Sequence, residues 1–133
     1  MGADHFGFEE LDLWKKVREF KKEISAEARN FPQQEKYRLT DQIIRSVRSI
    51  NALISEGHGR FTYPDQIHFC IQAHGSLTET INHLIDAYDE GYITGEKLNY
   101  YKLKGKEIER ILNGYLNFLR KKRDTPLEKD ASS

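Results

Sequence analysis

Four histidines lie near acidic residues in the sequence, and the combination is one that could bind metal. They are His58, His68, His74 and His83, and the neighbouring carboxylates are Asp65 and Glu79. Di-metal carboxylate bundles use a Glu from each of two helices plus two Glu-x-x-His repeats. This chain offers only Asp65-x-x-His68 and Glu79-x-x-x-His83. The spacing therefore predicts no metal site, and we interpret His74 as a core or interface histidine with a partner.

The sequence also lacks motifs for covalent catalysis. There is no G-x-S-x-G nucleophile motif and no glycine-rich phosphate loop. The single cysteine, Cys70, stands between Phe69 and Ile71 and is expected to be a small buried hydrophobe. We predict a protein without catalytic residues, metal or cofactors, and hence not an enzyme.

Basic residues are the second group that could do chemistry, by contacting phosphates. The 21 Lys and Arg balance 21 Asp and Glu, so no net charge attracts a polyanion. The charge is unevenly spread, because residues 61–93 contain five acidic residues and no Lys or Arg, whereas residues 94–133 contain ten basic and six acidic residues. The candidate phosphate contacts are Arg45, Arg48, Lys102, Lys106, Arg110, Arg120, Lys121 and Lys122. The alternative is a solvated helix face, since helix C-termini favour cations anyway.

A polar turn supplies a third candidate group. Glu56 and Arg60 are four residues apart around Gly57 and Gly59, and a charge-assisted hydrogen bond between them would close the turn. We expect Ser76 and Glu79 of the next helix to join them in one polar network, either as structural support or as a binding pocket.

Two glycines inside predicted helices need an explanation, since each costs about 0.5–1 kcal/mol relative to alanine. We predict that Gly75 and Gly105 allow close helix approach, with approach of a ligand as the alternative. Aromatic residues beyond those of the apolar stripes indicate either self-association or packing of the connections. They are Trp14, Tyr63, Phe69, Tyr88, Tyr92, Tyr100 and Phe118.

Apolar residues at three- and four-residue steps predict four helices that would position these side chains, at about 8–29, 35–55, 62–88 and 94–123. Pro32 ends the first helix, and the glycines at 57 and 59 are expected to end the second with positive φ. Thr62 and Thr94 are predicted N-caps of the last two. Connections of about six residues favour an all-α, antiparallel up-down-up-down four-helix bundle.

The bundle is expected to be a single domain over residues 1–123, followed by a disordered tail at 124–133, which is polar and lacks apolar periodicity. No apolar stretch reaches the roughly 18 residues of a membrane span, and the first residues do not resemble a signal peptide. We therefore expect a cytoplasmic protein.

Several short motifs resemble the bacterial four-helix-bundle family encoded in 23S rRNA intervening sequences. They are residues 8–14, Phe31-Pro32, Tyr37-x-Leu39, Gln42-Ile43-x-Arg45, Ser49-Ile50, Glu56-Gly57-x-Gly59-Arg60, Gly75-Ser76-Leu77-x-Glu79 and Gly91-Tyr92-Ile93. The resemblance implies an antiparallel bundle that can assemble as a homopentamer and carries no catalytic residues. It also implies similarity to the accessory protein of diversity-generating retroelements, which binds nucleic acid and a reverse transcriptase.

Together these observations predict an oligomeric, non-enzymatic bundle that binds structured RNA or a nucleic-acid-processing partner. The alternative is a protein-interaction scaffold without nucleic-acid binding, whose partner contacts the aromatic residues or the surface around Glu56 and Arg60. Binding of RNA that weakens steeply with salt would separate the two functions.

Overall fold

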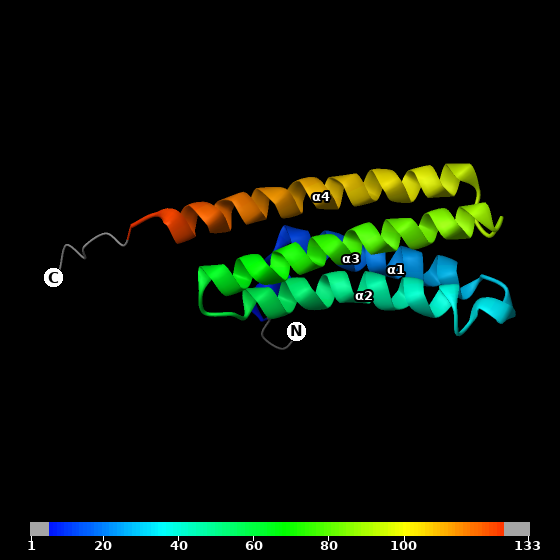
Figure 1. Cartoon of the computed structure of the whole chain (residues 1–133), viewed down its shortest axis with the longest axis horizontal. Coiled ribbons are helices and arrows are strands. Elements are labelled where there is room, and N and C mark those ends of the chain that lie inside the picture. The colour runs from blue at the N-terminus through cyan, green and yellow to red at the C-terminus, as the bar shows by residue number, and fades with distance from the viewer. Residues whose placement is uncertain (1–5, 127–133) are drawn as a thin grey trace, which may run out of the picture.

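Four long helices make up the computed structural model, which describes residues 6–126 (Figure 1). They are α1 (Asp12–Arg29), α2 (Leu39–His58), α3 (Tyr63–Asp89) and α4 (Gly95–Asp124). Short 3₁₀ turns at Gly7–Glu10 and Gln33–Glu35 precede α1 and α2, and residues 6–126 contain no strand. Most of the predicted tail, residues 127–133, lies outside the described residues, as do residues 1–5 of the predicted domain. The protein is all-α over its described length.

The helices lie side by side, and the chain reverses direction at each connection (Figure 1). α1 packs against α2 and α4, and α3 also packs against α2 and α4, whereas no Cα atoms of the diagonal pairs α1–α3 and α2–α4 lie within 8 Å of each other. This is compatible with the expected up-down-up-down bundle. One consequence matters for the surface: the face made by α1 and α2 is opposite the face made by α3 and α4.

A single hydrophobic cluster joins the four helices. Phe20 and Ile24 of α1, Ile43 of α2, Leu84 of α3 and Leu112 of α4 are all fully buried. Burying a side chain of this size contributes about 1.5–3 kcal/mol, so the interior residues dominate the stability of the bundle.

Cys70 belongs to this interior, as expected, and is 2% exposed. Burial raises the pKa of its thiol to about 11, because the charged thiolate is poorly solvated there. At neutral pH the group is a protonated thiol and packs as a small hydrophobe.

Local hydrogen bonds explain where the helices begin. The Thr62 and Thr94 hydroxyl oxygens accept the backbone N–H groups of Asp65 (3.3 Å) and Lys97 (3.1 Å), which confirms both predicted N-caps. α2 begins at Leu39 rather than near Glu35. The Glu35 carboxylate instead accepts the Leu39 N–H (3.4 Å) and the Tyr92 hydroxyl (2.7 Å), which holds it outside the helix.

The end of α2 differs from the prediction. The helix continues through Gly57 to His58, and Gly59 has φ −80°. Among the described residues, the one positive φ belongs to Gly91, at 79°. Gly57 is needed for space rather than for a turn, because a Cβ there would lie 2.7 Å from the Cβ of Phe69. The missing side chain lets α3 approach the last turn of α2.

Candidate nucleic-acid interface

Basic residues form a row along the exposed side of α4. Lys102, Lys106, Arg110, Arg120 and Lys121 follow helical spacing on one face, and all are exposed. From the first to the last the row spans about 28 Å, at 1.5 Å per residue. Among the described residues, Lys102, Arg110, Arg120 and Lys121 have no ion pair, and Lys106 approaches Glu109 at 3.3 Å. We call these five residues the α4 row.

The acidic residues that interrupt the α4 row are engaged by other cations. Glu107 accepts Lys16 of α1 at 2.6 Å, and this hydrogen bond lowers the pKa of its carboxyl. Glu109 accepts His74 of α3 at 2.9 Å and Lys106 at 3.3 Å, and these two bonds lower its pKa, with His74 the larger cause. The negative charge along the row is therefore locally compensated. The prediction that His74 has a partner at a helix interface is confirmed.

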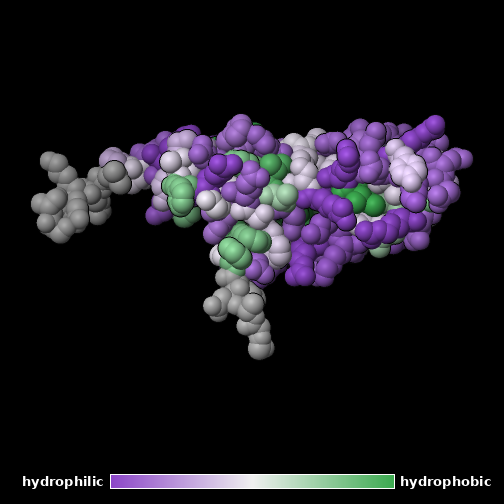
Figure 2. Space-filling model, turned by 90° about the horizontal axis from the view of Figure 1, so that it is seen from below, coloured by the Kyte–Doolittle hydropathy of each residue, from purple (hydrophilic) through white to green (hydrophobic). Residues whose placement is uncertain are grey.

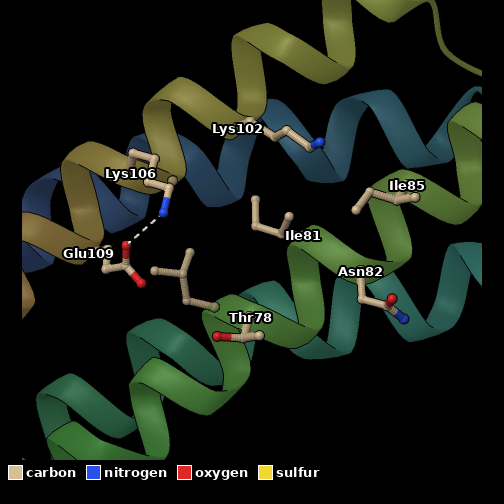
Figure 3. A pocket seen from close by; sticks show the side chains of 9 residues that line it. Thr78, Ile81, Asn82, Ile85, Lys102, Lys106 and Glu109 are labelled. Atoms are coloured by element: carbon tan, nitrogen blue, oxygen red, sulfur yellow. Dashed lines mark hydrogen bonds and ion pairs between the residues drawn. The ribbon is translucent and has the colours of Figure 1, made fainter.

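A groove of about 470 Å³ lies between α3 and α4, beside the first half of the α4 row. Its apolar floor includes Leu77, Ile81 and Ile85, and its rim includes Lys102 and Lys106. Ile81 lies between the two helices, and the side chains of Lys106 and Glu109 point toward each other at the mouth (Figure 3). The rim therefore carries two ammonium groups and the Glu109 carboxylate.

Gly105 forms part of this floor, and a Cβ there would lie 3.0 Å from Ile81 Cδ1. The predicted close approach at Gly105 is confirmed. The same prediction for Gly75 is wrong, because Gly75 is exposed and a Cβ there would meet nothing within 4 Å. Gly75 occurs on the outer side of α3, away from α2 and α4.

The last turns of α4 add further basic residues. Lys122 Nζ lies 5.7 Å from the ring centroid of Phe118, a cation–π distance, and Arg123 pairs with Asp124 at 2.8 Å. Arg120 and Lys121 line a shallow hollow with Asn117. The basic residues at the helix C-terminus thus continue the α4 row.

The two remaining candidates, Arg45 and Arg48, are on α2 at the α1/α2 face and do not join the α4 row. Arg45 pairs with Asp41 at 3.4 Å. Arg48 of α2 and Arg18 of α1 both lie near Lys21, since burial and then these two arginines lower the pKa of Lys21. The structure therefore divides the predicted basic residues between opposite faces.

Sequence reasoning missed Arg18, Lys21 and Lys22 as candidates. They occur on helix α1 at three- and four-residue spacing, which was the available signal. This spacing alone is also typical of a solvated helix face. These residues lie near Arg48 because α1 packs against α2.

The four residues expected to form one polar network make separate contacts instead. They are Glu56, Arg60, Ser76 and Glu79. Arg60 donates to Glu56 at 3.2 Å, which confirms the predicted pair, and its guanidinium also covers the Phe69 ring at 4.7 Å. Ser76 Oγ lies 3.0 Å from Ser49 Oγ, and Glu79 pairs with His83 at 3.3 Å. The prediction of a single network is wrong, because Ser76 is 13 residues into α3 and therefore about 20 Å along the helix axis from the turn.

Several of the candidate aromatic residues make contacts within the chain. Trp14 packs edge-on against Phe8, Tyr92 packs against Phe31, and the Tyr100 hydroxyl donates to Glu23. Other large apolar side chains are exposed: Phe61 is fully exposed, and Tyr63, Tyr88 and Phe118 are 41–50% exposed. Packing within the chain thus explains part of the set, and the rest of the set is exposed in the structure.

The histidines do not converge with one another. His68 contacts Gln72, His74 contacts Glu109, and His83 contacts Glu79 and Asp86. Within residues 6–126, no three His, Cys, Asp or Glu side chains form a group suited to a metal ion. None of the helices in this part of the chain has both the length and the hydrophobicity to cross a bilayer.

Comparison with known proteins gives a family and a fold. The family model described as 23S rRNA-intervening sequence protein matches residues 9–114. The chain is similar to a crystal structure of a protein with unknown function from the S23 ribosomal protein family of Bacteroides thetaiotaomicron, with 25% identity and a TM-score of 0.73. That match covers 79% of this chain and 95% of the other. A comparison with curated proteins gave no significant match.

Proposed function

The chain belongs to the 23S rRNA-intervening sequence protein family, and we propose that it is a non-enzymatic cytoplasmic four-helix bundle that binds structured RNA. An RNA-processing protein bound through the same nucleic acid is the partner class that fits this function. The α4 row supports the proposal: four of its five cations form no ion pair among the described residues, while Glu107 and Glu109 are occupied by other cations. Such a row offers phosphates a run of unpaired positive charge.

Binding of a fluorescently labelled RNA hairpin across a salt series tests this function. Replacing Lys102, Arg110 and Lys121 by alanine removes three unpaired cations, and we expect hairpin affinity to fall by at least about tenfold. The slope of log affinity against log salt should decrease by about 2–3, since roughly 0.9 counterions are released per phosphate contact in a duplex.

A charge-matched control separates a specific surface from a general loss of positive charge. Replacing Lys21, Lys22 and Arg48 by alanine removes the same charge from the opposite face, and affinity for a blunt-ended RNA duplex, which has no unpaired bases, is expected to change by less than about threefold. Salt-independent, negligible binding by the unmodified protein would contradict the proposed function.

A specific observation favours the second candidate, a protein-interaction scaffold. Phe61, which follows the Glu56–Arg60 pair, is fully exposed, and Tyr63 beside it is 41% exposed. Exposed aromatic residues next to a fixed ion pair are typical of a protein contact. Phe61→Ser is expected to weaken such a contact while leaving hairpin binding unchanged.

We also propose that the protein assembles as a homo-oligomer, with a pentamer as the expected state. The exposed Tyr88 and Phe118 side chains support a contact between copies, because large apolar side chains on a protomer are commonly covered by assembly. Light scattering at micromolar concentration should give a mass near five times the 15.6 kDa protomer. A mass of one protomer would overturn the assembly proposal.

A further inference from the structure

Cations from α1 and α2 gather on the face opposite the α4 row. The Thr40 hydroxyl of α2 donates to the Ala28 carbonyl oxygen of α1 at 3.3 Å, and this register of the antiparallel pair sets Arg48 of α2 at the level of Lys21 of α1. Arg18, Lys21 and Lys22 of α1 and Arg48 of α2 are called the α1/α2 basic cluster. Burial, then Arg18, Arg48 and Lys22, lower the pKa of Lys21, so the positive charges are close enough to repel. Within residues 6–126, Lys21, Lys22 and Arg48 have no ion pair. Like charges that lack a counter-charge favour an anionic ligand.

A pocket of about 430 Å³ lies at the connection between α1 and α2. Arg29, Lys36, Tyr37 and Ile44 are among the residues that line it. The Tyr37 side chain is 83% exposed, and Lys36 Nζ lies 5.4 Å from its ring centroid. The one carboxylate in the lining, Asp41, is paired with Arg45. The pocket therefore offers an accessible aromatic ring beside free cations.

The pocket and the α1/α2 basic cluster form one continuous surface. Ile44 lines the pocket, and Arg48 is one helical turn further along the same side of α2. On α1, Arg29, Ser25 and Lys21 likewise recur at four-residue steps. Figure 2, which views the molecule from the α2 side, shows a hydrophilic surface around a small hydrophobic patch toward the end where α1 connects to α2.

We propose that this surface binds single-stranded RNA, with phosphates on the α1/α2 basic cluster and a base stacked on Tyr37. Single strands are bound in this way, because a basic groove holds the backbone while an exposed aromatic ring accepts an unpaired base. A duplex has no free base to stack, and an acidic peptide would make no use of the ring. The inference rests on the proposed nucleic-acid function for its ligand class, but on different residues and a different face.

Fluorescence anisotropy with a labelled oligouridylate of about ten nucleotides tests the proposal, since this RNA forms no duplex. Alanine at Lys21, Lys22 and Arg48 should weaken its binding by at least about tenfold and reduce the salt slope by about 2. Tyr37→Ala should weaken binding at least about fivefold with the salt slope unchanged, whereas Tyr37→Phe, which keeps the stacking ring, should bind normally.

The single tryptophan gives an independent signal without a label. Trp14 is partly buried next to the cluster, with the Arg18 guanidinium 5.6 Å from its ring centroid. Oligouridylate should change its fluorescence in the unmodified protein, and this change should be lost in the Lys21, Lys22 and Arg48 variant. Unaltered melting temperatures would show that all these surface variants fold.

The outcomes distinguish this inference from the proposed function. Oligouridylate binding that depends on the α1/α2 basic cluster and Tyr37, but survives the Lys102, Arg110 and Lys121 variant, supports the inference even if hairpin binding fails. Oligouridylate affinity that is absent, or unchanged by both the cluster variant and Tyr37→Ala, overturns it. In that case the hairpin measurements decide the proposed function separately.

Discussion

Gly57→Leu is expected to lower the free energy of unfolding by about 2–3 kcal/mol, one of the two largest effects of a single substitution predicted for this protein. A Cβ at Gly57 would lie 2.7 Å from Phe69 Cβ and 3.6 Å from the backbone oxygen of Gln66. Phe69 Cβ is attached to the α3 backbone and cannot rotate away, so α3 itself would have to move. Urea unfolding followed by circular dichroism measures the effect.

Gly75→Leu is the matched control, because it makes the same chemical change in another long helix. Gly75 is exposed and has open space around its missing side chain. Leucine should raise the free energy of unfolding by about 0.5–1 kcal/mol through its higher helix propensity. Gly57→Ala provides a milder version if the leucine variant does not fold. Equal stability changes at positions 57 and 75 would show that contact with Phe69 does not determine the effect.

These glycines show which structural features could be predicted from the sequence and which could not. Apolar spacing predicted all four helices, and the caps at Thr62 and Thr94 were found because an N-cap bonds to a residue only three positions away. The space around a glycine depends on which side of its helix meets a neighbour. Gly75 and Gly105 look alike in sequence, yet only Gly105 faces another helix, where it meets Ile81. That difference follows from the relative rotation of packed helices.

The α4 row and the α1/α2 basic cluster differ in the same way: the first could be predicted from the sequence and the second could not. Lys102, Lys106 and Arg110 belong to one helix, so their four-residue spacing was enough to place them on one face. Arg48 and Lys21 are 27 residues apart, on separate helices, and no local pattern relates them. Which cations share a surface was decided by the pairing of α1 with α2. A basic surface that lies on one helix could therefore be predicted from this sequence, whereas a surface formed by two helices could not.

Asn51→Leu is expected to raise the free energy of unfolding by about 1–3 kcal/mol. The side chain is 4% exposed, and neither its Oδ1 nor its Nδ2 has a hydrogen-bond partner within the part of the chain that the structure describes. A buried amide without partners loses its hydrogen bonds to water on folding, and leucine of similar volume does not. Urea unfolding of the variant gives the measurement, and a clear loss of stability would contradict this assignment.

Thr80→Val provides the opposite case at the α2–α3 interface. Thr80 is fully buried, and its Oγ1 lies 2.9 Å from Ser46 Oγ and 2.8 Å from the Ser76 carbonyl oxygen. Valine keeps the shape but removes these contacts, so stability should fall by about 1 kcal/mol. Opposite signs for the two substitutions would show that hydrogen-bond satisfaction, rather than hydrophobicity, sets the effect of polar residues in this interior.

If Asn51 instead fixes the pairing of α2, the leucine variant would be more stable but would show a broader unfolding transition.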